Sequence, residues 1–502
     1  MSAPDDDEAR SGDGESARHG LPELIAERRA KAQRLRETDP QAFPYAFPNV
    51  EPISSILEGY GHLATGEETE DAHRVAGRLA ARRGSGRAAF LDLADRTDKI
   101  QLHARVDVLG EESYQRLLSL DLGDLIGVDG AVLRSRHGEL TLRVDSFQIL
   151  AKALRPPPDK YHGLSDVELR YRRRELDLIA NEDARRLFVD RAKIISAVRA
   201  YLDANGFVEV ETPVLQPLYG GALARPFTTH HNALDRDLYL RIATELYLKR
   251  LLVGGLERVY ELGKDFRNEG VSTKHNPEFT MVEFYEAYAD YEVAAGRLEE
   301  LARAAAGAIE YAGGWDFAGP WRRVGFIEAI AAATGIDLQA TDRNDAALAA
   351  AIRERSLELE TDGASWAQMA DDLLSKYVEP TLQEPTFVFD YPVELSPFAR
   401  AHRSEPGLVE RWEAFAGGME IANAFSELTD PDIQRERFEA QMRLAGQGDG
   451  EASQPYDELF VQALEQGMPP AGGVGLGIDR LVMLLMGADS IREVVLFPAL
   501  RS

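Results

Sequence analysis

The chain has 502 residues, of which 44% are hydrophobic and 28% charged, so it can bury a sizeable core and is expected to form roughly two to four domains. Its formal net charge of -28 argues against broad attraction to polyanions, so any nucleic-acid contact must be a local patch. The absence of cysteine excludes disulfides and Cys-ligated zinc, so a metal ion would have to be a hard cation held by oxygen.

The first segment, residues 1–20, is acidic and rich in Gly and Ser, which predicts a disordered tail. It has no apolar signal-peptide region, and the chain contains no run of about 18 apolar residues. We therefore expect a cytoplasmic protein that does not span a membrane. Residues 21–70 follow as an N-terminal helical extension, in which the charged stretch Leu21–Arg36 is typical of a solvated surface helix.

A barrel domain is predicted over residues 71–152. A helical segment near Glu111–Leu120 falls between its third and fourth strand-like runs, and turn residues separate most of the runs. The five runs are Arg74–Arg83, Ala88–Asp95, Lys99–Val106, Leu125–Leu133 and Leu140–Val144. Five short strands with a helix after the third indicate an OB-fold, a barrel that often binds oligonucleotides on its second and third strands.

Residues 153–165 form the predicted linker, because three consecutive prolines at 156–158 can continue neither a helix nor a central strand. The larger second domain is predicted over residues 166–502. It begins with a helix at Arg186–Asn205, whose apolar residues recur at helical spacing up to Gly206. Helical patterns at 290–311 and 345–377 predict an insertion at about 290–380 between two strand-rich blocks.

Three segments of the second domain carry recognisable motifs. They are GFVEVETP at 206–213, VYELGKDFRNEG at 259–270 followed by HNPEFTMVEFY at 275–285, and GVGLGIDRL at 473–481. Singly, a strand ending at proline is common and a glycine repeat usually marks a turn or close packing. Together they resemble motifs 1, 2 and 3 of the class II aminoacyl-tRNA synthetases, the second in its lysine-specific form. Asp479 supports that form, because most class II families have Glu there and the lysine branch usually has Asp.

The resemblance covers the chain from about Arg74 onward and implies an α+β fold. An N-terminal OB-fold β-barrel would precede a class II catalytic domain whose antiparallel sheet is flanked by helices. Motif 1 implies a homodimer. The implied activity is ATP-dependent ligation of L-lysine to tRNA(Lys) through a lysyl-adenylate, with ATP, lysine and tRNA as partners. In-line attack on the α-phosphorus needs alignment and charge neutralisation and no protein nucleophile.

The resemblance also assigns the ATP site. Arg267 would bridge the lysine carboxylate and the α-phosphate, because a planar guanidinium donates to two oxygens, while Phe279 would stack on adenine and Arg480 would bind the γ-phosphate. The implied catalytic residues are Arg267, Arg480 and Glu269, and the implied ATP-binding residues are Arg267, Glu269, His275, Asn276, Phe279, Glu413 and Arg480. Outside the motif, Arg267 would be read as a surface residue and Phe279 as core.

Glu413 and Glu420 match the family's Mg²⁺ ligands, which fits the preference of a hard cation for carboxylate oxygen. Without the resemblance, two glutamates seven residues apart would be interpreted as solvated acids on one helix face. The magnesium would be bound together with ATP.

Acidic residues also indicate which amino acid is selected, because a buried lysine ammonium needs carboxylates and hydroxyls around it. By resemblance, Glu283, Tyr285 and Glu427 lie at the side-chain end of lysine, and Glu245 and Gly221 at its α-amino end. Asn423 and Phe425 would frame the pocket. The chain departs from the family at Ala422 and Ala424, where relatives often have glycine.

Four residues of the predicted barrel match the family's anticodon site. Phe90 would stack on the central anticodon uridine, Arg83 and Gln101 would hydrogen-bond to it, and Glu139 would lie near the third base. Stacking on an aromatic ring contributes about 1–3 kcal/mol per base. The alternative is that Phe90 belongs to the barrel core.

Three alternative functions are considered. A related ligase that lysylates a translation elongation factor lacks the barrel and has alanine at one motif 3 glycine, whereas this chain keeps both the barrel and Gly475. A membrane-lipid lysyltransferase would need transmembrane helices. A non-catalytic tRNA-binding relative would have no need of all of Arg267, Glu269, Glu413, Glu420 and Arg480, which are present here.

Overall fold

The computed structural model describes residues 20–84, 86–158, 164, 166–222, 224–311, 313–396, 398–445 and 455–500. The predicted disordered tail, apart from Gly20, and much of the predicted linker lie outside these residues. The chain divides into two compact units, Met1–Arg185 and Arg186–Ser502, which are described separately. None of the helices in the described ranges is long and apolar enough to cross a membrane.

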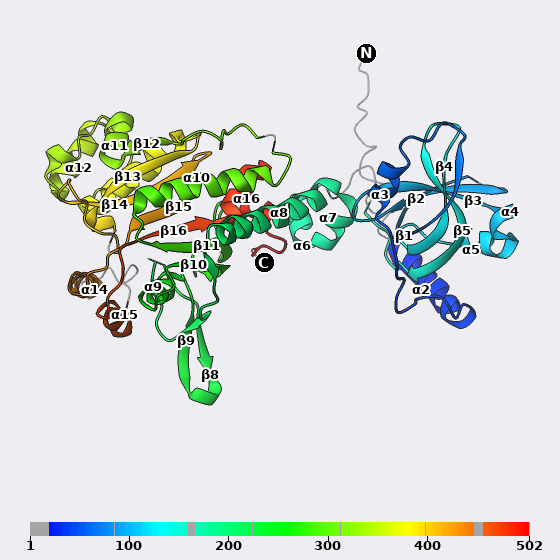
Figure 1. The fold of residues 1–502 in the computed structure, drawn as a ribbon, viewed down its shortest axis with the longest axis horizontal. Helices are drawn as coiled ribbons and strands as arrows, with labels where there is room; N and C mark the ends of the chain where they lie inside the picture. The colour runs from blue at the N-terminus through cyan, green and yellow to red at the C-terminus, as the bar shows by residue number, and fades with distance from the viewer. Residues whose placement is uncertain are drawn as a thin grey trace, which may run out of the picture. The chain divides into compact units, whose positions relative to one another are not determined.

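The first unit is built around a closed five-stranded barrel with the strand order β1-β2-β3-β5-β4 (Figure 1). Its strands are β1 (Glu68–Arg83), β2 (Ala88–Ala94), β3 (Lys99–Arg105), β4 (Leu125–Arg134) and β5 (Leu140–Ala151). Its helices are α2 (Leu21–Thr38), α3 (Ile53–Gly59), α4 (Val106–Leu109), α5 (Glu111–Leu118), α6 (Val167–Arg172) and α7 (Arg174–Ala180). The predicted order of five strands with a helix after the third is confirmed.

The barrel core follows from the alternation of apolar residues along each strand. On β3, Ile100, Leu102 and Ala104 are buried while the residues between them are partly exposed. Helix α2 is mostly exposed, as expected for a charged helix, but Arg28 is buried and donates to the carbonyls of Leu122 (3.1 Å) and Ala153 (2.8 Å). These bonds attach the helical extension to the barrel.

The second unit contains an eight-stranded sheet with the order β12-β13-β14-β15-β16-β11-β10-β6. Its strands are β6 (Val208–Glu209), β10 (Arg258–Phe266), β11 (Glu278–Ala287), β12 (Arg322–Gly325), β13 (Thr386–Pro392), β14 (Leu408–Ala416), β15 (Met419–Ser426) and β16 (Ala471–Gly477). The six central strands pair antiparallel, as expected, whereas the outer strands β6 and β12 each pair parallel to a neighbour. A separate three-stranded sheet holds β7 (Leu215–Gln216), β9 (Arg236–Leu240) and β8 (Thr228–His231).

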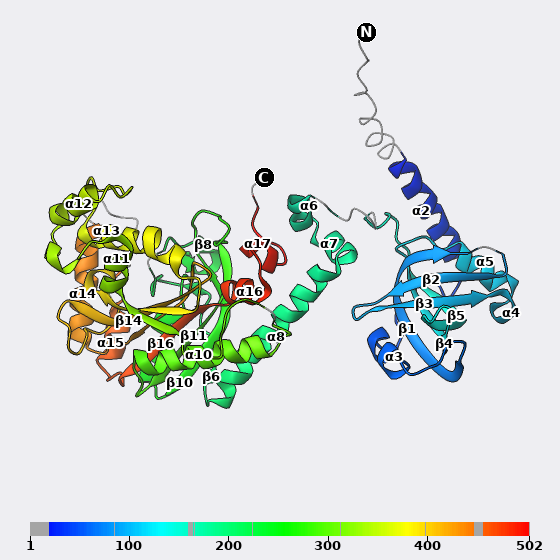
Figure 2. The same cartoon turned by 90° about the horizontal axis from the view of Figure 1, so that it is seen from above.

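The helices that follow α7 are α8 (Glu182–Ala204), α9 (Glu245–Val253), α10 (Tyr291–Gly307), α11 (Phe326–Thr334), α12 (Asp345–Glu354), α13 (Trp366–Leu373), α14 (Pro431–Ala445), α15 (Glu458–Leu464), α16 (Ile478–Met486) and α17 (Ile491–Val494). Helices α8, α10 and α16 pack on one face of the large sheet (Figure 2). Short helical turns are η1 (Asn232–Leu234), η2 (Gln339–Thr341), the π-turn η3 (Leu374–Val378), η4 (Glu379–Thr381) and η5 (Val393–Leu395).

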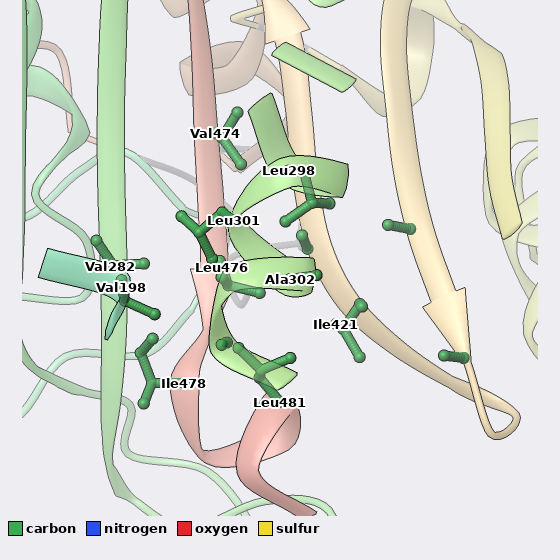
Figure 3. Packing of buried hydrophobic residues seen from close by; sticks show 14 of the residues in the cluster. Val198, Val282, Leu298, Leu301, Ala302, Ile421, Val474, Leu476, Ile478 and Leu481 are labelled. Atoms are coloured by element: carbon green, nitrogen blue, oxygen red, sulfur yellow. The ribbon is translucent and has the colours of Figure 1, made fainter. Parts of the chain in front are cut away.

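The segment predicted as a helical insertion contributes a strand as well as helices. It contains β12, which extends the main sheet by pairing with β13, and the predicted helix at 345–377 is divided into α12 and α13. Helix α10 is part of the main core: Leu298, Leu301 and Ala302 pack with Val282 and Leu476 of the sheet (Figure 3). Residues of α8 and α16 pack into the same cluster.

Candidate active site

A cavity of about 400 Å³ lies against the central strands of the eight-stranded sheet. Alternation places successive residues of a strand on opposite faces, so Glu283 and Tyr285 of β11 line the cavity while Val282 and Phe284 enter the core. The glycines of β16 follow the same rule, because Gly475 lines the cavity and its apolar neighbours are buried. One sheet face is therefore closed by helices and the other forms the floor of the site.

Most of the residues predicted for the second unit meet in this cavity. Those that line it are Arg267, Glu269, His275, Asn276, Phe279 and Arg480 from the predicted ATP site, Gly221, Glu245, Glu283, Tyr285, Asn423 and Phe425 from the predicted lysine site, and Glu420 from the predicted metal site. Glu413 and Glu427 are not part of its lining. Motifs 2 and 3, far apart in the sequence, are neighbours because β11 pairs with β16.

One end of the cavity is rich in arginine. Arg480, in the first turn of α16, donates to the Glu420 carboxylate (3.0 Å) and to Nε2 of His275 (3.1 Å). Burial, followed by the charge of Arg480, lowers the pKa of His275, so its imidazole is neutral near pH 7 and can accept this bond. The neighbouring Asp479 is buried, accepts from the Thr280 amide (2.7 Å) and pairs with Arg191 (2.7 Å), so it supports motif 2.

Arg267 and Phe279 lie at the same end. The Arg267 guanidinium lies over the Phe279 ring, 5.1 Å from its centroid, and the Arg267 amide donates to the Pro277 carbonyl (2.9 Å). Both side chains line the cavity, so Arg267 is not simply a surface arginine and Phe279 is not a core residue. A cation and an aromatic face directed into one cavity provide contacts for a phosphate and for a planar base.

The two predicted metal ligands are on adjacent strands, Glu413 on β14 and Glu420 on β15, so they are not acids on a helix face. Glu413 accepts from the Tyr391 hydroxyl (2.8 Å) and from Arg411 (2.5 Å). Burial raises the pKa of Glu413 to about 7, opposed by Arg411 and reinforced by the charge of Glu420. A cation would relieve the repulsion within this pair. In the described residues, no group of three or more His, Asp or Glu side chains is placed to hold a metal.

The other end of the cavity is acidic. Glu283 is buried, accepts from the Thr244 amide (3.3 Å) and lies 3.5 Å from the Tyr285 hydroxyl. Burial, followed by the charges of Asp265 and Glu245, raises the pKa of Glu283 to about 8. Glu245 at the start of α9 is also buried, and burial raises its pKa despite the nearby Lys249. Two buried carboxylates and a phenol at one end of the cavity suit a cationic ligand.

Glycine makes this arrangement possible at two points. A Cβ at residue 473 would overlap the Glu427 carboxylate and the Tyr285 ring, so only Gly473 lets both approach β16. Gly221 has φ of +86°, a conformation that side chains rarely adopt, and a Cβ there would lie 3.0 Å from that of Glu245. Ala422 and Ala424, where relatives often have glycine, do not narrow the cavity, because both residues belong to the core on the opposite sheet face.

Several polar residues in or near the cavity were missed from the sequence, among them Arg411 and Lys249. Arg411 lines the cavity, donates to Asn423 (2.9 Å) and to Glu413, and packs over the Tyr391 ring. Arg411 precedes Glu413 by two residues, and residues two apart in a strand share a face, so the sequence could have indicated Arg411. Lys249 pairs with Glu245 and Glu427 behind the acidic end. Only its spacing of four from Glu245 on a helix was visible in the sequence.

The barrel carries a second candidate site. Register pairs Arg83 with Phe90 and Phe90 with His103, and the rings of Phe90 and His103 stack at 4.7 Å with a 6° interplanar angle. Gln101 of β3 donates to Glu139 (2.7 Å), which immediately precedes β5. Phe90 is partly exposed and lies outside the buried barrel cluster, so the interpretation of Phe90 as core is wrong. His103 was not predicted from the sequence.

Comparisons with known proteins agree with this geometry. The family described as tRNA synthetases class II (D, K and N) matches residues 166–501, and an OB-fold nucleic acid binding domain matches residues 73–150. "Lysine--tRNA ligase" of Moorella thermoacetica is 50% identical over 487 residues, covering 95% of this chain and 98% of the relative. The protein of the same name from Bacillus subtilis is 48% identical over 490 residues, covering 96% and 98%.

Proposed function

This chain belongs to the class II tRNA synthetases of the D, K and N group, and we infer that it is the lysine-specific enzyme, a lysine–tRNA ligase. It activates L-lysine with ATP to lysyl-adenylate, releasing pyrophosphate, and transfers the lysyl group to the 3′ end of tRNA. The observation that carries the lysine assignment within the site is the acidic end of the cavity, where Glu283, Tyr285 and Glu245 converge. An aspartate-specific enzyme would need cations there.

The residues of the cavity suit the first step. Arg267 and Arg480 provide positive charge where a bent triphosphate would lie, and Phe279 offers a face to adenine. With the ammonium groups of lysine held at the acidic end, its carboxylate would point toward Arg267. Attack of that carboxylate oxygen on the α-phosphorus forms the mixed anhydride and expels pyrophosphate, so the protein contributes alignment and charge neutralisation.

The family generally uses ATP with a divalent metal, and we propose Mg²⁺ held by Glu413 and Glu420 together with phosphate oxygens. The charge of Glu420 adds to burial in raising the pKa of Glu413, which supports this role, because a bound cation would offset the repulsion between the two carboxylates. When bound, the ion would neutralise charge on the phosphates. Two carboxylates would be enough for this role, because Mg²⁺ is usually bound by one or two protein carboxylates together with substrate phosphates.

The edge of the large sheet supports a homodimer. Strand β6 of motif 1 is the outermost strand, and Val208 in it exposes 49% of its surface. Val214 and Leu215, which follow motif 1 in the chain, expose 41% and 46%. An exposed apolar strand edge is normally covered by a partner. We propose that a second copy of the chain covers it, and that the dimer acts in the cytoplasm, where its tRNA substrate is used.

The barrel supplies tRNA selection in this proposal. Phe90, stacked on His103 and flanked by Arg83 and Gln101, forms a platform for an unstacked base. The function is tested by lysine-dependent exchange of pyrophosphate into ATP, followed by lysine charging of total tRNA. Exchange that depended on another amino acid, or exchange without tRNA charging, would overturn it.

A further inference from the structure

The loop between β10 and β11, residues 267–277, carries several of the residues predicted to bind ATP. They are Arg267, Glu269, His275 and Asn276, all of which line the cavity. The structure describes every residue of this loop, and none of them belongs to a helix or strand. A backbone without ladder hydrogen bonds is held by its contacts with neighbouring segments, so these contacts decide where the ATP-binding side chains lie.

Two backbone N–H groups from outside the loop hold its second half. The Ile491 amide donates to the Thr273 carbonyl (2.8 Å). The Ala499 amide donates to Oδ1 of Asn276 (3.1 Å). Asn276 is 7% exposed, and its Nδ2 donates to the Glu278 carbonyl (2.6 Å). Both polar atoms of this buried carboxamide therefore have a partner, which fixes its orientation.

The segment that supplies these donors has an anchor of its own. Ser490 caps α17 in a capping box with Glu493. Ile491 and Val494 are buried in the main core. Ile491 is the first residue of this helix, where an N–H group has no acceptor within the helix. Its N–H is therefore available to the loop, and a segment bound to the core holds the Thr273 carbonyl.

A further contact of the loop depends on groups that ATP would engage. His275 accepts from Arg480 (3.1 Å), and both residues are proposed to bind ATP, so the nucleotide would compete for this bond. Lys274 donates to the Gly418 carbonyl (2.8 Å) through a flexible side chain whose exposed fraction is 42%. The bond from Ile491 joins two backbone groups and requires no group of the ATP site, so it can persist when the site fills.

We propose that Ile491 and Ala499 are positioning residues for ATP binding, because their N–H groups hold the second half of the loop at the cavity. They fix Thr273 and Asn276, and His275 lies between these two. This inference rests on the proposed function. Because the two residues act through the loop, ATP affinity is expected to depend on their N–H groups, whereas lysine affinity is not.

Proline at residue 491 removes one of these N–H groups without breaking α17. Proline is favoured at the first position of a helix, and Ser490, with φ of -142° and ψ of 139°, has the extended conformation that precedes proline. Ile491→Ala is the matched control, because both variants lose the isoleucine side chain and only Ile491→Pro loses the N–H. The KM for ATP should be about 3- to 10-fold higher in Ile491→Pro than in Ile491→Ala, and the KM for lysine should agree within about twofold.

Residue 499 offers a second matched pair, because Ala499→Pro removes the N–H and Ala499→Gly keeps it. The KM for ATP should again differ by about 3- to 10-fold. Asn276→Ala removes the acceptor, so in this background Ala499→Pro and Ala499→Gly should differ by less than about twofold, since the two changes disrupt one shared bond. A general distortion caused by proline would persist in that background.

The assay is lysine-dependent pyrophosphate exchange, with KM determined separately for ATP and lysine and with thermal unfolding as the measure of folding. Wild type without lysine-dependent exchange would refute the proposed function itself. With active wild type, the inference fails if a folded proline variant matches its control in the KM for ATP, if the KM values for ATP and lysine rise together, or if Asn276→Ala leaves the effect of Ala499→Pro undiminished. If one proline variant does not fold, the pair at the other position decides, and failure of both to fold overturns the inference.

Discussion

Glu283→Gln tests the acidic end of the cavity directly, because it changes one buried carboxylate to a neutral group of the same size. Removing one partner of a buried charge pair costs about 3–5 kcal/mol. Glu283 must first be ionised to pair with the substrate, and with a pKa of about 8 this costs about 1.4 kcal/mol at pH 7. The net loss is about 1.6–3.6 kcal/mol, or roughly 15- to 450-fold in lysine affinity.

The assay is steady-state pyrophosphate exchange at pH 7, with KM determined separately for lysine and ATP. The KM for lysine should rise by this factor while that for ATP changes less than about twofold, since Arg267 and Arg480, the proposed ATP-binding residues, lie at the other end. Glu286→Gln is the matched control, because Glu286 is a buried carboxylate on the same strand that pairs with Arg297 and does not line the cavity. A lysine KM within threefold of wild type in folded Glu283→Gln would refute the assignment of the ammonium site.

Three further outcomes are expected. Lysine binding should release protons near pH 7, because the empty site keeps Glu283 largely protonated with a pKa of about 8 and an ammonium group favours its ionised form. Affinity should therefore rise up to about pH 8, and calorimetry in buffers of different ionisation enthalpy that found no proton release would contradict this. Arg267→Ala should reduce pyrophosphate exchange at least about 150-fold, corresponding to about 3 kcal/mol, in a protein with unchanged thermal unfolding, and near-normal exchange would remove Arg267 from the mechanism. Phe90→Ala should leave pyrophosphate exchange intact but lower tRNA charging efficiency by roughly 5- to 150-fold. The variant should lose little further efficiency on transcripts altered at the central anticodon base. Unchanged charging and anticodon preference would exclude base stacking on Phe90.

Local patterns in the sequence were sufficient to predict the barrel strands and the three motifs. Strand-like runs bounded by turn residues predicted the strands, because turn residues mark where a strand ends. A glycine repeat such as that of motif 3 usually marks a turn or close packing, and the structure shows close packing at Gly473. Sequence order, however, could not distinguish whether Phe90 faced into the barrel or outward, because the direction of a side chain depends on which strand face the core covers.

The remaining features depend on contacts between distant segments. Lys249 could be matched with Glu245 by helical spacing, but its second partner, Glu427, follows β15 and meets α9 only in the folded protein. The stack of Phe90 on His103 depends on the register of β2 with β3. The sequence by itself therefore determined which residues are candidates for the chemistry, because the motifs that resemble those of a known family are continuous segments of the chain. Only the tertiary structure decided their charge balance, because burial and the pairing of carboxylates are properties of the assembled sheet and helices.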